Sequence, residues 1–133
     1  MLKKIFISFL SSIALFCQTT PPALRKVTIN IVSYDWKRYD KFSIDLITKI
    51  LEKYNVSYQI TVKSWELIMV HQNQYQIILT VPMDDQSHGQ QTYDTFYKSK
   101  PYYNISKTTK LYMMFHKDVI GKTLKELIDS EIN

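Results

Sequence analysis

The chain has 133 residues, 45% of them hydrophobic and 14% aromatic, and a formal net charge of +5. This size and apolar fraction are sufficient for one packed domain and exclude an intrinsically disordered chain. The chain contains only two glycines, which excludes a glycine-rich phosphate loop. Its basic residues are scattered along the sequence, so we expect no nucleic-acid partner.

Residues 1–20 are predicted to be a secretory signal peptide. Lys3 and Lys4 precede a short apolar run interrupted by serines, and a polar stretch with two prolines follows. The run is too short to span a bilayer permanently, which takes about 20 residues. We therefore expect a periplasmic or otherwise extracytoplasmic protein. Cys17 is the only cysteine, so an exported product has no internal disulfide. Two alternatives stay open for this segment, a lipid attached to Cys17 and an uncleaved anchor.

The next elements are expected to alternate between strands and helices. Apolar and polar residues alternate over 27–33, which predicts a strand, and an aromatic loop over 34–40 follows it. Residues 42–54 have the pattern of an amphipathic helix. Asn55 is predicted to end that helix, and 56–63 alternate as a second strand.

The order of elements predicts an α/β fold. Ser64 is a favourable N-cap for a helix over 65–71. Residues 75–81 are a short continuous apolar run, typical of a strand buried on both faces. Strand, helix, strand, helix and strand in this order predict a largely parallel sheet between layers of helices.

The C-terminal part is expected to add one strand and one helix. Residues 82–98 are polar and rich in turn formers, which predicts a long loop. Residues 111–116 are mainly apolar and predict a strand, and 123–132 have the pattern of a short amphipathic helix.

No pattern of catalytic or metal-binding residues is present. The histidines, His71, His88 and His116, lack the spacing of a metal-binding motif. The acidic pair Asp84 and Asp85 is typical of a turn, and no Gly-x-Ser-x-Gly motif occurs. We therefore expect no cofactor, no metal and no enzymatic activity.

Several motifs in order resemble the first lobe of bacterial extracytoplasmic solute-binding proteins of family 3, which serve importers of polar amino acids. They are an opening strand with an aromatic loop, a Phe-x-x-Asp-Leu pattern at Phe42, Asp45 and Leu46, a Trp that starts the second helix at Trp65, a third strand that ends in the small polar Thr80, and Ser99-Lys100-Pro101-Tyr102 before a strand similar to the one that crosses between lobes.

The resemblance implies an incomplete fold of the type 2 periplasmic-binding-protein class. Residues 26–117 would form a three-layer βαβαβ lobe, and 118–133 would begin the hinge and a truncated second lobe. In the family the chain returns from the second lobe to finish the first. The resemblance therefore implies an open sheet edge, through which the protein would self-associate, and uncovered apolar surface.

The resemblance also implies capture of a small polar, amino-acid-like ligand for the membrane permease of an ABC importer. The ligand contacts that it carries over are Tyr34, Trp36, Trp65, Thr80, Val81 and Tyr102. Amino-acid binders of the family hold the ligand carboxylate with an Arg after the third strand. Here no Arg occurs beyond Arg38. The corresponding region contains His88, Gln90, Gln91 and Thr92.

Other interpretations stay open. Tyr34 and Trp36 could cover the sheet edge, Trp65 could belong to the core, and Tyr102 could pack the hinge. The protein itself could be a single-lobe interaction or sensor module without a transport role, or a truncated product without function.

Overall fold

The computed structural model describes residues 19–84 and 95–132. Residues 1–18 of the predicted signal peptide with Cys17, and the stretch with Asp85, His88, Gln90, Gln91 and Thr92, lie outside the described residues. The described elements in chain order are η1 (Pro22–Leu24), β1 (Thr28–Tyr34), α2 (Asp40–Lys53), β2 (Ser57–Lys63), α3 (Trp65–Val70), η2 (Gln72–Gln74), β3 (Ile77–Asp84), β4 (Phe96–Lys98), β5 (Tyr103–Asn104), β6 (Thr109–His116) and α4 (Val119–Glu131).

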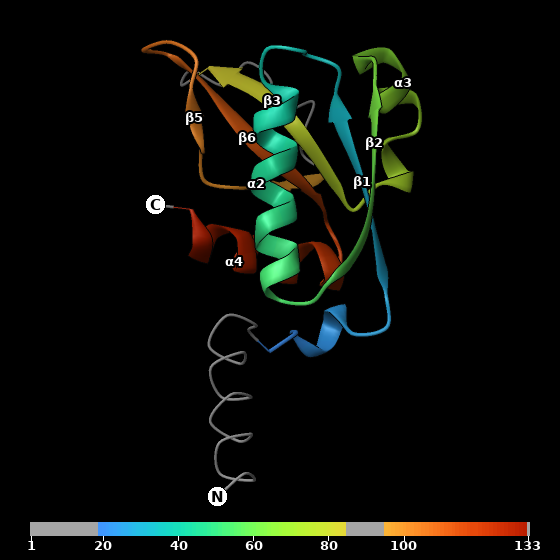
Figure 1. Cartoon of the computed structure of the whole chain (residues 1–133). Coiled ribbons are helices and arrows are strands. Elements are labelled where there is room, and N and C mark those ends of the chain that lie inside the picture. Colours follow the sequence, from blue (N-terminus) through green and yellow to red (C-terminus); the bar gives the residue numbers. More distant parts are fainter. Residues whose placement is uncertain (1–18, 85–94, 133) are drawn as a thin grey trace, which may run out of the picture.

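The sheet is mixed. Its strand order is β2-β1-β3-β6-β4, and β5 also pairs with β6 (Figure 1). Strand β1 is parallel to β2 and β3, whereas β6 is antiparallel to β3, β4 and β5. The predicted α/β fold is confirmed, but the prediction of a largely parallel sheet is wrong for the half that contains β6.

Helices cover both faces of the sheet. Helices α2 and α4 lie on one face, where Ile47, Leu51, Leu124 and Ile128 pack with alternate residues of β1, β3 and β6 (Figure 1). On the other face, Ile68 of α3 packs with the remaining inward residues of the same strands. Because alternate residues of a strand point to opposite faces, β1, β3 and β6 supply both cores, which explains why they are apolar nearly throughout.

The predicted helices and strands are present with shifted ends. Strand β3 continues to Asp84, so Thr80 lies inside the strand and not at its end. Helix α2 begins at Asp40, and Phe42, expected on its buried face, is 45% exposed. Strands β4 and β5 were not predicted, because three and two residues are too few to show an alternating pattern.

Strand β6 and helix α4 belong to the same core as the rest of the chain. Residues 111–117 were expected to cross between lobes, but β6 lies inside the sheet and pairs with β3 on one side and β4 on the other. Residues 118–133 were expected to begin a second lobe. In the structure Leu124, Ile128 and Ile132 pack in the core formed by β1, β3 and α2. The apolar surface of this face is therefore covered by α4.

Candidate functional site

A row of aromatic side chains lines the end of the sheet where β1 and β2 finish and α2 begins. Its members are Trp65, Tyr34, Trp36, Tyr39, Tyr103, Phe42 and Tyr102. In that order, the ring centroids of neighbours are 5.6, 6.1, 4.6, 5.4, 5.3 and 6.2 Å apart. These separations are those of mutually attractive aromatic pairs. We call this set the aromatic rim.

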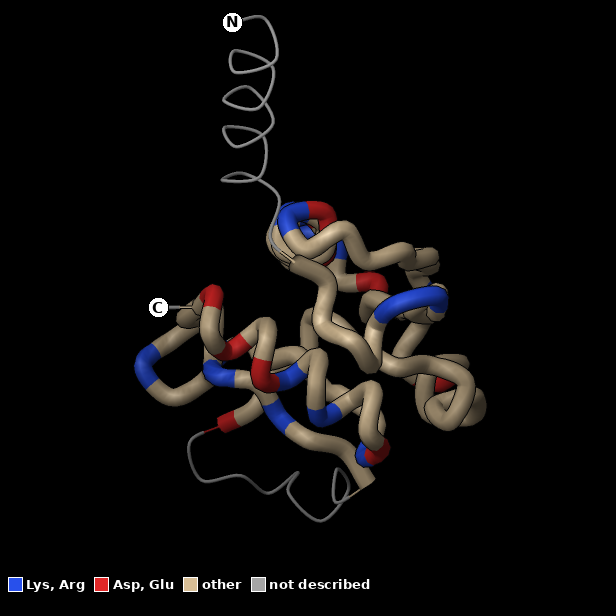
Figure 2. Tube along the Cα trace, turned by 90° about the horizontal axis from the view of Figure 1, so that it is seen from below, with Lys and Arg blue, Asp and Glu red and all other residues tan. Residues whose placement is uncertain are grey.

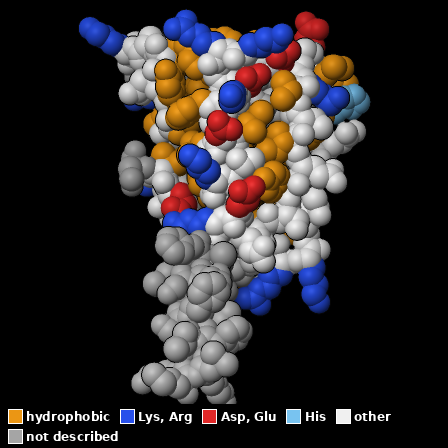
Figure 3. All heavy atoms as spheres, viewed as in Figure 1, with side chains coloured by type: hydrophobic (Ala, Val, Ile, Leu, Met, Phe, Trp, Pro, Cys, Tyr) orange, Lys and Arg blue, Asp and Glu red, His pale blue; other side chains and the backbone are white. Residues whose placement is uncertain are grey.

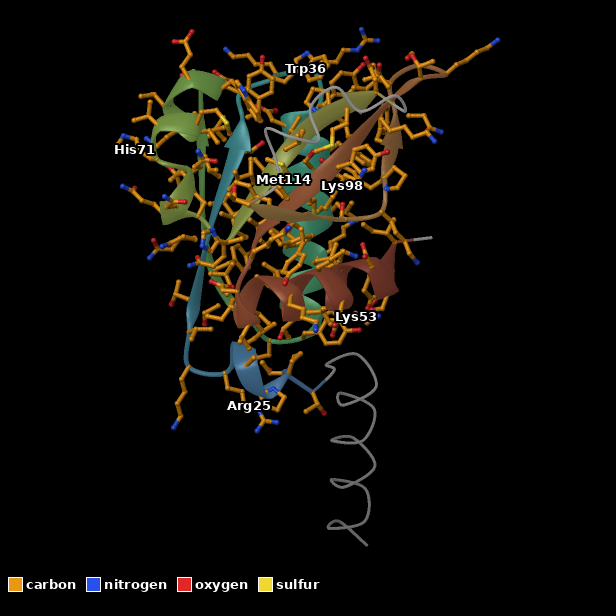
Figure 4. The ribbon with its side chains drawn as sticks, turned by 180° about the vertical axis from the view of Figure 1, so that it is seen from behind. Arg25, Trp36, Lys53, His71, Lys98 and Met114 are labelled. Atoms are coloured by element: carbon orange, nitrogen blue, oxygen red, sulfur yellow. The ribbon has the colours of Figure 1, made fainter. Side chains whose placement is uncertain are left out.

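The aromatic rim has both exposed and buried members. Phe42 and Tyr103 are 45% and 39% exposed, whereas Tyr39 is buried. Trp36 lies at the opposite end of the molecule from Arg25 (Figure 4). Ligands of open α/β sheets bind outside the carboxyl ends of parallel strands, and the rim occupies this position for β1 and β2.

A buried polar network lies beneath the rim. The Thr80 hydroxyl is 2.9 Å from the Ser33 hydroxyl on β1, and both residues are fully buried. The backbone N–H of Thr80 donates to the Tyr102 hydroxyl at 3.1 Å. The same hydroxyl is 2.5 Å from the Ser43 hydroxyl on α2. Tyr102 thus joins the rim to β3 and α2.

Thr80 has an unusual backbone conformation. Its φ is 63°, in the left-handed region, and the pairing of β3 with β6 shifts register between Ile78 and Val81. A β-branched residue rarely adopts this conformation, which costs about 1–3 kcal/mol unless the surroundings enforce it. Here the two hydroxyls of Ser33 and Tyr102 hold the bulge in place. Strain of this kind concentrates at functional sites.

Burial raises the pKa of the Tyr102 phenol, and the hydrogen bonds with Ser43 and Thr80 oppose this effect. The phenol is therefore neutral at physiological pH. As a neutral hydroxyl it can accept the Thr80 N–H and still donate one proton to Ser43. Tyr102 acts here as a structural link between β3 and α2.

The structure brings most of the predicted ligand contacts together. Tyr34, Trp36, Trp65 and Tyr102 are members of the rim, and Thr80 lies directly beneath Tyr102. Val81 differs, because its side chain is fully buried in the second core on the other face of the sheet.

Sequence reasoning missed Tyr39, Phe42 and Tyr103 as rim members and the two serines of the network. Tyr39 and Tyr103 are 64 positions apart in the chain, yet their rings pack 5.4 Å apart. Ser33 and Ser43 gave a usable signal, since each is a polar residue in an otherwise apolar inward position of its element.

The electrostatic environment of the rim is mixed. The guanidinium of Arg38 lies 5.6 Å from the centre of the Tyr39 ring. Lysines and arginines are spread along the trace among aspartates and glutamates (Figure 2), and some lie along the upper edge of the surface in Figure 3.

In the described part of the chain, no group of three or more His, Cys, Asp or Glu residues is placed to hold a metal ion. No helix within residues 19–84 and 95–132 is long and apolar enough to cross a membrane.

The Ser99-Lys100-Pro101-Tyr102 segment is held against β6. Ser99 is buried, and its hydroxyl accepts the backbone N–H of Met113 at 2.9 Å. The backbone N–H of Lys100 donates to Asp129 of α4 at 2.8 Å. These bonds fix the direction in which Tyr102 enters the rim.

Two solved structures are similar to the chain. Both are of domain 1 of a protein named TmArgBP in its arginine-bound form, and one carries a single mutation. The mutant has a TM-score of 0.59 and 16% identity over 77% of this chain and 87% of the neighbour. The other has a TM-score of 0.58 and 16% identity over 77% of this chain and 89% of the neighbour. No protein-family model matches the sequence, and no curated protein matches it.

These likenesses establish the fold. The chain has the α/β fold of domain 1 of TmArgBP, and the fold class predicted from the sequence is confirmed.

Proposed function

We propose that the chain is the ligand-capturing lobe of an extracytoplasmic solute-binding protein, which holds a small polar, amino-acid-like ligand against the aromatic rim. The observation that carries this proposal is the rim itself, a continuous row of rings at the carboxyl ends of β1 and β2 above a strained, hydrogen-bonded bulge. The two neighbours in fold were solved in arginine-bound form, which supports a ligand of this class.

The chemistry of the rim suits a ligand with a cationic end. Exposed aromatic faces attract ammonium and guanidinium groups by about 0.5–2 kcal/mol. Phe42 and Tyr103 are 45% and 39% exposed, so a flat or cationic group can reach them. Arg38, the guanidinium nearest to the rim, is placed to meet a ligand carboxylate, for which its planar donors are well suited.

Binding by this lobe alone is expected to be weak. Good sites bury about 70–90% of a small ligand, and one wall cannot do so. Tight capture would require a second wall, such as another lobe or the permease of an importer, that closes over the rim. Transfer of the ligand to such a permease is part of the proposal.

Intrinsic fluorescence gives a direct test. The chain has two tryptophans, and both lie in the rim. Titration with L-arginine should change tryptophan emission in a saturable manner in the millimolar range, and L-glutamate should bind at least about tenfold more weakly. Isothermal titration calorimetry should give the same dissociation constant.

Two variants locate the binding. Trp36→Leu should weaken L-arginine binding at least about tenfold without loss of the folded circular dichroism spectrum. Tyr97→Leu is the matched control, because Tyr97 is a half-buried aromatic residue on β4 outside the rim. If no amino acid changes the emission or the melting temperature, the proposal fails, and the exposed rim would then favour a single-lobe interaction module.

A further inference from the structure

We propose that two copies of the chain associate by antiparallel pairing of their β2 strands, which joins two sheets into one. The proposal does not depend on ligand binding. It starts from the sheet order, in which β2 is the terminal strand and has β1 as its one partner among the described strands.

The two edges of the sheet differ in their protection. The edge opposite β2 consists of β4 and β5, which are three and two residues long, and the Lys98 ammonium lies over the Tyr112 ring there (Figure 4). Short strands and lysines are devices that block pairing with another chain. Strand β2 has seven residues, no proline and no acidic residue, and its one charge is Lys63 at the end. It lacks these devices over most of its length.

The hydrogen-bonding groups of β2 can be assigned to its two sides. The carbonyl of Lys63 accepts the backbone N–H of Asp35, so Lys63 faces β1. Backbone groups alternate in direction along a strand. Ser57, Gln59 and Thr61 therefore also face β1, and the N–H and C=O groups of Tyr58, Ile60 and Val62 point outward.

This pattern is self-complementary about Ile60. Antiparallel pairing centred there places Tyr58 opposite Val62 of the second copy and Ile60 opposite its own counterpart. Every one of these pairs is of the hydrogen-bonded type, in which both N–H groups and both carbonyls are used. The apolar side chains of these residues then adjoin one another on the face of the sheet that α2 covers, where Val62 is now 45% exposed.

Charge does not oppose the pairing. In this register Lys63 lies opposite Ser57, so the lysines of the two copies are separated by six residues of paired strand, about 20 Å. At that distance two exposed charges are largely screened at physiological ionic strength, where the Debye length is about 8 Å. A second copy is therefore the occupant that the edge fits best.

Sedimentation equilibrium tests the proposal by measuring the molecular mass of the protein over a range of concentrations. The protein is purified with its natural N-terminus. Wild type should pass from monomer to dimer as concentration rises. Val62→Pro removes an outward N–H that has no role in the β1–β2 pairing, and proline is tolerated at such edge positions. It should raise the dimer dissociation constant at least about tenfold.

Val119→Pro is the matched control. Val119 is 74% exposed and occupies the first position of α4, where proline is favourable, so dimerisation should be unchanged.

Hydrogen exchange provides a readout without mutation. The amides of Tyr58, Ile60 and Val62 should gain protection at high concentration, whereas those of Gln59 and Thr61 should be protected at all concentrations. A wild type that is monomeric throughout, or a Val62→Pro protein that dimerises equally well, would overturn the proposal.

Discussion

At the scale of single residues, Tyr102 connects parts of the chain that are distant in sequence. Its hydroxyl meets the backbone of Thr80 and the side chain of Ser43, and its ring stacks on Phe42 with an interplanar angle of 14°. One side chain therefore contributes to the rim and holds the strained bulge below it. The rim and the bulge are expected to respond together when this residue changes.

Replacing Tyr102 by Phe should lower the free energy of unfolding by about 1–3 kcal/mol, because the buried N–H of Thr80 loses its acceptor. Urea denaturation measures the change. Tyr103→Phe, at the adjacent and exposed position, is the control and should cost less than about 0.5 kcal/mol. Equal losses for the two variants would show that the Tyr102 hydroxyl has no role in stability.

Local signals in the sequence predicted some residues well and could not predict others. Ser64 caps α3 as predicted, with its hydroxyl accepting the N–H of Leu67. Asn55, with a φ of 55°, ends α2 as predicted, because asparagine tolerates the left-handed conformation. The left-handed conformation of Thr80 could not be predicted, since threonine favours an ordinary strand and the bulge depends on Ser33 and Tyr102, which are remote in sequence.

At the scale of elements, α4 approaches the end of β6 very closely. A Cβ atom added to Gly121 would lie 1.6 Å from the carbonyl oxygen of His116. The Asp118 side chain fixes this approach by accepting the N–H of Gly121 at 2.6 Å. The sequence predicted that this helix starts at Thr123, but α4 begins at Val119 and therefore includes Gly121. Glycine normally weakens a helix, but here the close contact of backbone with backbone requires it.

Gly121→Ala should destabilise the protein by about 1–3 kcal/mol, since the backbone of α4 or of β6 must move to admit the new methyl group. Lys122→Ala, at the next and exposed position, should have little effect, because alanine is the better helix former. Thermal unfolding followed by circular dichroism compares the two. An unchanged melting temperature for Gly121→Ala would mean that α4 does not approach β6 as described.

At the scale of the whole molecule, contacts between α2 and α4 close the core. Glu131 on α4 forms an ion pair with Lys53 at 2.7 Å and accepts a hydrogen bond from the Tyr54 hydroxyl at 2.7 Å. The hydrogen bonds from Lys53 and then Tyr54 lower the pKa of the Glu131 carboxyl. The same carboxylate raises the pKa of Lys53 and of Tyr54.

Stability should therefore depend on Glu131 in acid. A carboxyl whose pKa is lowered by folding contributes stability above its unfolded pKa of about 4.3, and this contribution is lost as pH falls through the folded pKa. At neutral pH the free energy of unfolding of wild type should exceed that of Glu131→Gln by up to about 1 kcal/mol, because the Lys53–Glu131 ion pair is partly exposed. The difference should shrink below about pH 4. Urea unfolding across pH measures it, with Glu126→Gln on the same helix as control. A difference that does not change with pH would contradict this role.

The fold class was predictable from sequence because strands and helices alternate with clear periods through the first half of the chain. The direction and position of β6 were not predictable, because an apolar strand carries no mark of its neighbours. The aromatic rim was predictable only in part. Its members on the first loop follow a strand directly, whereas Tyr103 reaches the rim through the pairing of β5 with β6.

The position of β6 also governs when the protein can fold. Strand β6 comes last in chain order among the described strands, yet it lies between β3 and β4 and pairs with both. Until residue His116 is available, β4 and β5 have no neighbour, and the apolar residues of β3 lack one side of their sheet. Contacts of such long sequence separation are slow to form. A growing chain therefore has no complete sheet until β6 has been made, and the two halves of the sheet on either side of β6 can join only then.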